Sequence, residues 1–501
     1  MFSQPIYTTA QIRQLEHAAL AQDPHCALME RAGLAAADYA RELLGEAGTD
    51  VLVICGAGNN GGDALVAARH LKQWWYRVTV VLAGDAAKLP VDAARALQQF
   101  QAAGGETLPD VPAHGTWSLV VDGLFGIGLT RELSGHPLQL IQRINALDAP
   151  VLALDIPSGL DADTGNVHGA AIQADHTITF IALKPGLLTA DGLDYCGRIR
   201  CAKLNLDAAR LLPPTGWLLD ETVAKFMPRR RANSHKGLFG SVGIIGGAHG
   251  MLGAAVLAAR AALKLGAGRV YLGALSPMAP AVDLEQPELM WHSPHQVLEL
   301  DLLDVLVTGP GIGQSAAANA LLTTAVQAYR PLVLDADALN LLAHNPNIQA
   351  ALLNRTAATI LTPHPAEAAR LLGCSTMDVQ HDRLTATLEL ARQFNSAVVL
   401  KGAGSMCALA DGRWVINPSG NPGMSSAGMG DVLSGMLGAL LGQGLEAEQA
   451  ALLAVYLHGA AADACVANGI GPVGLTASEV IDSARGLINR WVYAARRHHC
   501  G

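Results

Sequence analysis

Short apolar runs rich in β-branched residues alternate with helical stretches along this chain, and the alternation occurs in two separate series. Such alternation is typical of parallel strands buried between two layers of helices. The first series consists of "VLVICG" (51–56), "RVTVVLAG" (77–84), "SLVVDGLFG" (118–126), "VLALDIPSG" (151–159) and "HTITFIAL" (176–183). The second consists of "GSVGIIGGA" (240–248), "GRVYLGAL" (268–275), "DVLVTGPGIG" (304–313), "PLVLDADAL" (331–339), "ATILTPHPAE" (358–367) and "AVVLKGAG" (397–404).

A stretch with a Pro-Pro pair, polar residues and no repeated strand signal separates the two series. The chain has 501 residues, whereas a single core stops growing near roughly 250–300 residues. The motifs of the two series differ, which indicates two unlike modules rather than a duplication. The sequence therefore predicts two tandem three-layer α/β domains, at 1–213 and 228–501, joined by a linker at 214–227.

The charge of the chain argues against a nucleic-acid partner. The formal net charge is −9, so no basic field draws in a polyanion. The short "PRRR" run at 228–231 is interpreted as a solvated edge of the linker. We expect small molecules as partners, and the alanine-rich helices permit a homo-oligomer, which we also expect.

No pattern in the sequence indicates a membrane or a secretory route. The first residues lack a charged segment followed by an apolar one. The longest apolar helix, expected near 252–265, is interrupted by Arg260 and Lys264. Eight cysteines without a C-x-x-C pair indicate reduced thiols rather than a zinc site or a disulfide framework. We therefore expect a cytoplasmic protein.

The first glycine-rich turn reads "GAGNNGGD" (56–63) and follows an apolar run. A tight turn here presents backbone N–H groups at the start of a helix, an arrangement that binds phosphate. It is not the dinucleotide fingerprint, because the acidic residue comes at Asp63 and no Asp or Glu ends the next strand at 78–82. The turn indicates either a phosphate-bearing ligand or a glycine turn used only for close packing.

Three further strands of the first series end in polar or glycine-rich segments. These carry Asp122 with "GLFGIGL", Asp155 with "IPSG", and Lys184 in "IALKPG". Because the ends of parallel strands open onto one crevice, we expect these side chains to converge. Oxygens of Asn60, Asp122 and Ser158 suit a weakly hydrated cation, and Asp155 with Lys184 suits an acid/base pair.

The second glycine-rich turn, "SSAGMGDVLSG" (425–435), opens an apolar helix. Gly428 and Gly430 let backbone amides approach a transferring phosphoryl group, and Asp431 can accept a hydroxyl proton. The turn is not a Walker loop, since no G-x-x-x-x-G-K-[ST] is present. The alternative is that Asp431 merely caps its helix.

Other strand ends of the second series supply partners for Asp431. His364 lies between two prolines, in a stiff turn from which it can bond a substrate. Glu367 either caps the next helix or approaches magnesium through water. Asp335 and Asp337 alternate along an extended run, so they face one site together only if the strand has ended. The segment 401–405 is either a phosphate contact or a glycine hairpin.

The motifs "GAGNNGGD", "LDIPSGLDADTG" and "HTITFIALKPGL" closely resemble those of the NAD(P)HX epimerase domain. The resemblance implies a Rossmann-like domain that epimerises the hydrated carbon of a damaged nicotinamide ring. It implies Asp155 as a catalytic residue and K⁺ near Asn60, Asp122 and Ser158. Lys184, which also lies in a family motif, is assigned as a second catalytic residue. The implied substrate-binding residues are Asn59, Asn60, Gly61, Gly62, Asp63, Gly126, Ile127, Gly128, Leu129, Thr130 and Arg131.

One residue departs from this family's pattern. The family motif usually continues "NNGGDG", whereas this chain has Ala64. A methyl group at the start of the helix can crowd the ligand, although alanine is a better helix former than glycine.

The set "GPGIG", "DADALN", "TPHPAE", "KGAG" and "AGMGD" resembles the ADP/ATP-dependent NAD(P)HX dehydratase, a ribokinase-like domain. The resemblance implies Asp431 as the catalytic base, ADP as co-substrate and Mg²⁺, although the residues do not distinguish ADP from ATP. The implied substrate contacts are Gly253, Gly311 and His364, and the implied nucleotide contacts are Lys401, Gly402, Ala403, Gly404, Ser405 and Gly430. Met429 stands where many ribokinase-like chains have threonine, so backbone amides replace a hydroxyl contact there.

The two resemblances together imply a bifunctional repair enzyme. It would interconvert the R and S forms of hydrated NADH or NADPH, and dehydrate the S form at the expense of ADP, giving AMP and phosphate. A vitamin-precursor kinase of the ribokinase-like class, fused to a nucleotide-binding sensor domain, is the alternative.

Overall fold

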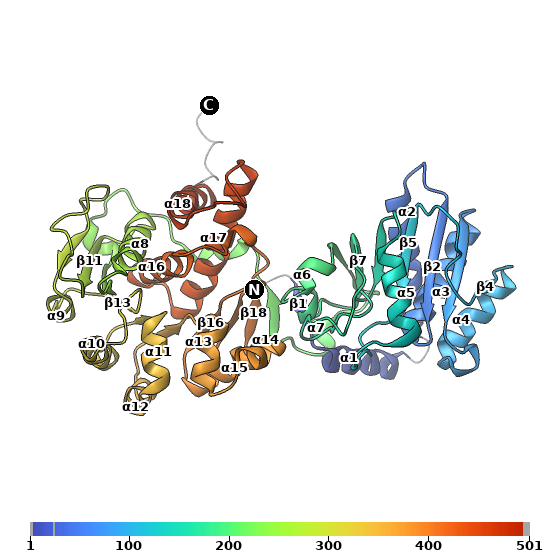
Figure 1. Cartoon of the computed structure of the whole chain (residues 1–501), viewed down its shortest axis with the longest axis horizontal. Helices are drawn as coiled ribbons and strands as arrows, with labels where there is room; N and C mark the ends of the chain where they lie inside the picture. Colours follow the sequence, from blue (N-terminus) through green and yellow to red (C-terminus); the bar gives the residue numbers. More distant parts are fainter. Residues whose placement is uncertain (1–3, 24–25, 494–501) are drawn as a thin grey trace. The chain divides into compact units, whose positions relative to one another are not determined.

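The computed structural model describes residues 4–23 and 26–493, and the chain divides into two compact units (Figure 1). The N-terminal unit is Ser3–Trp217, and the C-terminal unit contains Leu218–Gly501. Segment 214–227, expected as a linker, holds the short strand β9 (Gly216–Leu218) and the 3-10 helix η3 (Glu221–Phe226). The outer ends of both expected domain ranges, 1–3 and 494–501, lie outside the described residues.

The N-terminal unit contains a sheet in the order β4-β3-β2-β5-β6-β7-β8, in which every neighbouring pair is parallel. The strands are β2 (Asp50–Gly56), β3 (Arg77–Ala83), β4 (Thr107–Leu108), β5 (Leu119–Gly123), β6 (Val151–Leu154), β7 (His176–Phe180) and β8 (Arg198–Ala202). A separate short strand, β1 (Pro5–Ile6), pairs antiparallel with β9.

Helices cover both faces of this sheet (Figure 1). Residues of β2 alternate between two hydrophobic cores, with Val51 and Val53 in one and Leu52 and Ile54 in the other. This is the pattern of a strand buried on both faces. The helices are α1 (Thr9–Gln22), α2 (Leu28–Leu44), α3 (Asn59–Gln73), α4 (Val91–Ala102), α5 (Gly135–Asn145), α6 (Gly192–Tyr195) and α7 (Ala208–Leu211), with the 3-10 turns η1 (Ala86–Lys88) and η2 (Pro185–Leu187).

The C-terminal unit has a larger sheet whose order within the unit is β18-β17-β16-β15-β14-β13-β10-β11-β12. Its pairs are parallel from β12 to β16 and antiparallel from β16 to β18. The strands are β10 (Ser241–Gly246), β11 (Arg269–Ala274), β12 (Met290–His292), β13 (Val305–Thr308), β14 (Leu332–Leu334), β15 (Thr359–Leu361), β16 (Ala397–Leu400), β17 (Met406–Ala408) and β18 (Trp414–Ile416).

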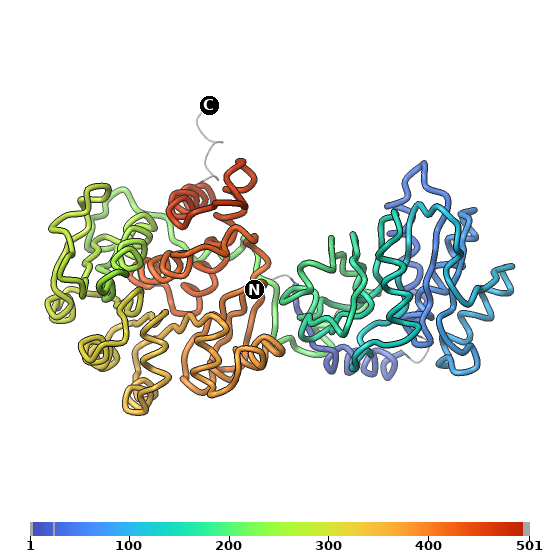
Figure 2. The backbone as a smooth tube through the Cα atoms, viewed as in Figure 1, coloured from blue at the N-terminus to red at the C-terminus, as the bar shows by residue number. Residues whose placement is uncertain are grey.

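The helices of this unit form two packed groups, which the backbone trace follows from green to red (Figure 2). One group is α8 (Leu252–Lys264), α16 (Met429–Gly442), α17 (Ala447–Ala467) and α18 (Ala477–Tyr493). The other is α9 (Pro294–Leu298), α10 (Ala316–Gln327), α11 (Asp337–His344), α12 (Pro346–Leu353), α13 (Pro365–Leu372), α14 (Thr376–His381) and α15 (Arg383–Gln393), and the remaining 3-10 turns are η4 (Lys236–Phe239) and η5 (Pro422–Met424). The predicted α/β class with parallel sheets is confirmed in both units.

Helix α17 corrects one expectation from the sequence. It has 21 residues and is apolar enough to cross a membrane by length and composition, whereas α8, expected as the longest apolar helix, has 13. The apolar window of α17 is 67% buried, and the helix packs against α16, α18 and β16. Its apolar character is that of a core helix. Cysteines in the described part of the chain are free, and Cys500 lies outside that part.

Candidate active sites

The first candidate site lies where the strand order of the N-terminal sheet reverses. From β2 the chain first continues to β3 on one side, and β5 later pairs with the other side of β2. Loops that leave the carboxyl ends of such strands diverge and open a crevice. Asn60, in the first turn of α3, and Asp122, near the end of β5, both come from these loops.

Asn60, Asp122 and Ser158 converge on the backbone of Phe125. The Asn60 amide donates to the Phe125 carbonyl at 2.9 Å and to the Leu154 carbonyl at 3.2 Å. The Ser158 hydroxyl lies 2.6 Å from Asp122 Oδ1 and 3.2 Å from the same Phe125 carbonyl. The structure thus brings together the three residues expected to hold a cation.

The chemistry of this group fits a weakly hydrated cation. Asn60 Oδ1 is buried and has no hydrogen-bond partner among the described residues. Burial raises the pKa of Asp122 to about 6, although hydrogen bonds from Ser158 and Leu124 act in the opposite direction. A cation would satisfy the lone oxygen and compensate the buried carboxylate.

Asp155 and Lys184 form an ion pair at the ends of β6 and β7. The ammonium group of Lys184 donates to Asp155 Oδ1, to Thr179 Oγ1 at 2.7 Å and to the Phe180 carbonyl at 2.9 Å. Its side chain is 1% exposed, whereas that of Asp155 is 13% exposed. A Cβ built on Gly126 would lie 3.4 Å from Asp155 Oδ2, so the second carboxylate oxygen faces the 126–131 loop.

The backbone of Asp155 adopts an unusual conformation. Its φ of 65° lies in the left-handed region, which side chains other than glycine seldom adopt. Such strain collects at functional sites, where the surrounding structure holds a side chain in place. Here the turn after β6 directs Asp155 toward Lys184.

Two further carboxyl groups interact with the Asp155–Lys184 pair. Burial raises the pKa of Glu16 on α1, and the charge of Asp155 raises it further. Burial followed by the charge of Asp155 also holds the pKa of Asp63 well above its usual range. Asp63 was predicted from its motif. Glu16 was not, because a single glutamate on an amphipathic helix carries no signal for a site.

The remaining predicted substrate residues differ in their exposure to solvent. Asn59, Gly128, Thr130 and Arg131 are exposed, Ile127 is partly buried, and Leu129 is 8% exposed within a hydrophobic core. Gly61 and Gly62 are buried, and a Cβ on Gly61 would lie 2.0 Å from the Gly56 carbonyl. Close packing therefore explains the glycine at 61, whichever ligand the turn binds.

Ala64 packs inside the N-terminal unit. Its side chain is fully buried, and a Cβ built on Gly123 would lie 2.5 Å from the Ala64 Cβ. The methyl group fills the space between α3 and the end of β5. The packing gives no indication of crowding, and the effect of Ala64 on a ligand stays a prediction.

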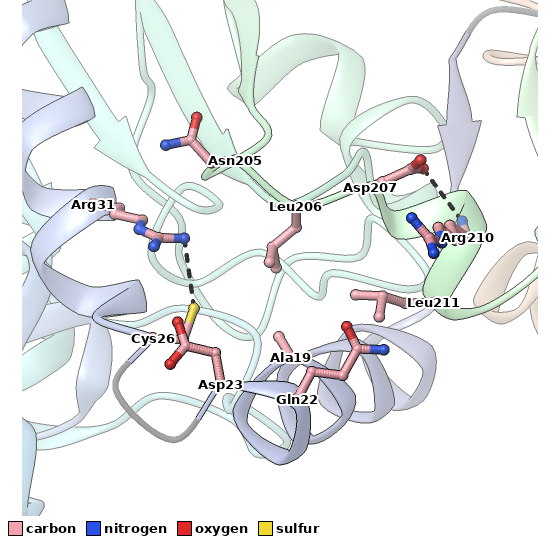
Figure 3. A pocket seen from close by; sticks show the side chains of 10 residues that line it. All are labelled: Ala19, Gln22, Asp23, Cys26, Arg31, Asn205, Leu206, Asp207, Arg210 and Leu211. Atoms are coloured by element: carbon pink, nitrogen blue, oxygen red, sulfur yellow. Dashed lines mark hydrogen bonds between the residues drawn. The ribbon is translucent and has the colours of Figure 1, made fainter.

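A cavity of about 390 Å³ lies elsewhere in the N-terminal unit (Figure 3). It is formed by the end of α1, the start of α2 and the segment 205–211. The Arg31 guanidinium at its edge donates to the Leu204 carbonyl at 3.1 Å and lies 3.5 Å from Cys26 Sγ. None of the predicted site residues lines this cavity.

The second candidate site lies at the strand-order reversal of the C-terminal sheet, between β10 and β13. The loops after these strands are bonded together, since Gly247 N donates to the Pro310 carbonyl at 3.0 Å and Ala248 N to the Gly311 carbonyl at 2.6 Å. Gly311 is buried with a φ of 58°, and a Cβ there would meet the Met251 carbonyl at 2.6 Å. Gly253 is exposed at the start of α8.

Asp431 lies in the first turn of α16. Gly428, with a φ of 89°, occupies the cap position, so Asp431 is the third residue of the helix rather than its cap. Met429, the first residue of the helix, is 5% exposed. Burial raises the pKa of Asp431 to about 7, and the charge of Asp335 contributes to the increase. A carboxyl group with this pKa takes up and releases a proton near neutral pH.

The buried Asp335 forms an ion pair with the partly buried Lys401. Lys401 Nζ donates to Asp335 Oδ1 at 2.7 Å, and the Ser434 hydroxyl donates to Oδ2 at 2.7 Å. Burial alone would raise the pKa of Asp335, but the charge of Lys401 and these hydrogen bonds outweigh it and lower the pKa. Strand β14 ends at Leu334, so Asp335 and Asp337 no longer alternate along a strand. The charges of both residues raise the pKa of Asp431.

His364 caps α13 together with Glu367. His364 N donates to Glu367 Oε2 at 2.8 Å, and Ala366 N donates to His364 Nδ1 at 3.1 Å. This is a reciprocal capping arrangement. The His364 side chain is 47% exposed, so its ring reaches solvent at the edge of the site.

The segment 401–405 connects β16 to the antiparallel strand β17 and is therefore a hairpin loop. Gly402 and Ala403 are exposed, and the Ser405 hydroxyl donates to the Gly402 carbonyl at 3.0 Å. The buried Arg383 lies beneath the loop, 2.9 Å from a Cβ built on Gly402. A Cβ built on Gly430 would lie 3.1 Å from Lys401 Nζ, which places the loop beside α16.

Two protein families match the two halves of the chain. A family described as YjeF-related protein N-terminus matches residues 25–186. A family described as NAD(P)H-hydrate dehydratase matches residues 242–484. The first match holds Asn60, Asp122, Asp155 and Lys184, and the second holds Asp335, Lys401 and Asp431.

Similar proteins cover nearly the whole chain. The bifunctional NAD(P)H-hydrate repair enzyme Nnr of Escherichia coli is 41% identical over 476 residues, which are 92% of this chain and 89% of that protein. The enzyme of the same name from Coxiella burnetii is 39% identical over 97% of this chain and 99% of its own length. A bifunctional NAD(P)H-hydrate repair enzyme of Leishmania braziliensis is 39% identical over 97% of this chain and 93% of its length.

Solved structures resemble parts of the chain. The ADP/ATP-dependent NAD(P)H-hydrate dehydratase of Bacillus subtilis, co-crystallised with ATP/Mg²⁺, is 30% identical with a TM-score of 0.48. It covers 54% of this chain and 96% of its own length.

Proposed function

The chain belongs to the family of bifunctional NAD(P)H-hydrate repair enzymes, and from this premise we propose which of its two units catalyses each reaction. The N-terminal unit interconverts the R and S forms of hydrated NADH or NADPH. The C-terminal unit dehydrates the S form with ADP, giving AMP and phosphate. We place the epimerase domain at 1–213 and the dehydratase domain at 228–501.

In this proposal Asp155 catalyses epimerisation, and Lys184 is its hydrogen-bonded partner. The hydrated carbon carries a ring nitrogen and a hydroxyl group, so inversion requires one of these bonds to break and to re-form on the other face. A proton moves each time, and Asp155 has one carboxylate oxygen turned toward the 126–131 loop. Lys184 uses its three N–H donors inside the protein, so it positions Asp155 rather than exchanging protons itself.

The substrate would lie across the start of α3. The backbone N–H groups of Asn59, Asn60 and Gly61 would face the anionic part of the substrate, because the first N–H groups of a helix lack partners within the helix. Gly62 N already donates to the Gly58 carbonyl at 3.2 Å, so Gly62 and Asp63 would line the turn without offering a free N–H group. The loop 126–131 would cover the ring. Asn60, Asp122 and Ser158 would hold K⁺, which when bound supplies positive charge beside the crevice.

Dehydration rests on Asp431. Water leaves a carbinol poorly, whereas phosphate leaves readily, so transfer of a phosphoryl group to the hydroxyl makes elimination possible. Asp431 takes the hydroxyl proton as the oxygen attacks phosphorus, and AMP departs with the electron pair of the broken P–O bond. The phosphate then departs with the C–O electron pair, a proton is lost from the neighbouring ring carbon, and the double bond re-forms.

The other residues of this site position the two reactants. Gly253, Gly311 and His364 would contact the hydrated nucleotide, and Lys401 to Ser405 with Gly430 would contact ADP. The exposure of Gly402 and Ala403 in the 401–405 hairpin supports the latter assignment. Mg²⁺ would enter with the nucleotide and neutralise charge on its phosphate oxygens. We further propose a cytoplasmic homo-oligomer.

The observation that carries the dehydratase assignment is the position of Asp431 in the first turn of α16, next to Gly430 and near Lys401, where burial raises the pKa of its carboxyl group to about 7. The test supplies both epimers of hydrated NADH, with ADP or ATP as donor, and follows the return of absorbance from the reduced ring. Return with ADP supports the proposal. No return with either donor favours a small-molecule kinase.

A further inference from the structure

The ion pair between the buried Asp335 and the partly buried Lys401 has a specific place relative to Asp431. Asp335 is 1% exposed, and both of its carboxylate oxygens accept hydrogen bonds at 2.7 Å, from Lys401 and from Ser434. Buried carboxylates are costly unless they are paired and hydrogen-bonded, and this one is. Asp335 therefore remains an ionised, fixed group at the end of β14.

This ion pair contacts the first turns of α16 on both sides of Asp431. Ser434 is three residues after Asp431, so the two side chains lie on neighbouring parts of one helix face. A Cβ built on Gly430, the preceding residue, would lie 3.1 Å from Lys401 Nζ and 3.6 Å from Asp335 Oδ2. The helix segment that carries Asp431 is thus bonded to Asp335 at one point and in contact with the pair at another.

We propose that Asp335 is a positioning residue of the dehydratase site, which fixes Lys401 and the start of α16 and thereby sets the place and the electrostatic surroundings of Asp431. This inference rests on the proposed role of Asp431 and adds a residue to that site. A merely structural ion pair would support the fold without influencing when Asp431 gains its proton.

The charges around Asp431 allow a positioning role of Asp335 to be distinguished from a merely structural one. After burial, the charge of Asp335 makes the largest contribution to the raised pKa of Asp431, and Lys401 acts in the opposite direction. Asp337 and Glu367 also face Asp431 and raise its pKa. Removal of Asp335 or Lys401 should therefore change the pKa of Asp431 in opposite directions.

The experiment measures kcat/KM for dehydration of the S epimer with ADP between pH 5 and 9, in the full-length chain. Asp335→Asn should move the midpoint of the acid limb down by about one unit, because a neighbouring negative charge is lost. Lys401→Met should move the midpoint up. Ser434→Ala, which leaves both charges in place, should lower kcat without moving the midpoint.

Midpoints that do not move, or that move in the same direction in Asp335→Asn and Lys401→Met, would overturn the inference. If Asp335→Asn does not fold, Lys401→Met compared with Lys401→Arg decides, since arginine keeps the charge and should leave the midpoint in place. Asp431→Asn is measured alongside. Full activity of that variant would refute the proposed base itself, whereas unmoved midpoints with an inactive Asp431→Asn refute only the role of Asp335.

Discussion

Lys184 is fully enclosed beside Asp155, and its ammonium group donates three hydrogen bonds, to the Asp155 carboxylate, the Thr179 hydroxyl and the Phe180 carbonyl. Lysine has three N–H donors in this state, so none remains for a substrate. This arrangement distinguishes a lysine that holds a catalytic carboxylate from one that acts on a ligand directly.

Lys184→Met is expected to abolish epimerisation and to destabilise the N-terminal unit. Breaking a buried ion pair leaves an uncompensated carboxylate, at a cost of about 3 kcal/mol or more. Urea denaturation and an assay of epimer interconversion would measure both effects. As a matched control, Thr179→Val removes one acceptor of Lys184 and should cost about 1 kcal/mol. Normal epimerisation in Lys184→Met would contradict the positioning role.

Potassium should stabilise the N-terminal unit specifically. A ligand that binds only the folded state raises the free energy of unfolding, by roughly 2.7 kcal/mol at 100 times its Kd, and therefore also raises the unfolding temperature. We expect KCl to raise Tm more than LiCl at the same ionic strength. Asp122→Asn should remove the difference between the two salts. An equal response of the wild type to both salts would argue against a cation at Asn60, Asp122 and Ser158.

Ala64→Gly should destabilise the chain without improving substrate binding. The change loses helix propensity and a buried methyl group, together about 2 kcal/mol. KM for epimerisation should stay unchanged, because the Ala64 methyl packs on Gly123. Ala68→Gly, at another buried position of α3, is the control for stability. A KM that falls severalfold in Ala64→Gly alone would show that the methyl group does crowd the ligand.

The pH dependence of dehydration should report Asp431. Its pKa is about 7, and the base must be unprotonated to accept the hydroxyl proton. Activity should therefore be present above this pH and fall as pH decreases through it. A profile of kcat/KM against pH for the S epimer measures this decrease. Activity that stays constant from pH 8 to pH 5 would exclude Asp431 as the base.

Much of the fold could be predicted because each strand of the two series carries a local signal. β2 and β10 are continuous apolar runs with glycine at their ends, and their neighbours repeat the pattern. The outer strands β4, β8, β12, β17 and β18 were missed. Strand β8, with five residues, carries two arginines in place of an apolar run, and the other four have only two or three residues and give no periodicity. Segment 214–227 lacked a strand signal for the same reason, yet it contains β9.

The sites were predictable where residues follow the central strands. Asn60, Asp122 and Asp155 all lie at carboxyl ends of parallel strands, which meet by topology. Asp335 and Lys401 also follow parallel strands, but nothing in the sequence indicated that these two, 66 residues apart, would pair at 2.7 Å. Glu16 was not predictable in this way, because it comes from a helix outside the strand series.

The most direct test of two independent sites uses a mixture of both epimers of hydrated NADH with excess ADP. Wild-type chain should convert all of it to NADH. Asp155→Asn should convert the S form and then slow to the spontaneous rate of epimerisation, and Asp431→Asn should equilibrate the epimers without forming NADH. The two variants mixed together should restore full conversion. Formation of NADH by Asp431→Asn at the wild-type rate would contradict the account.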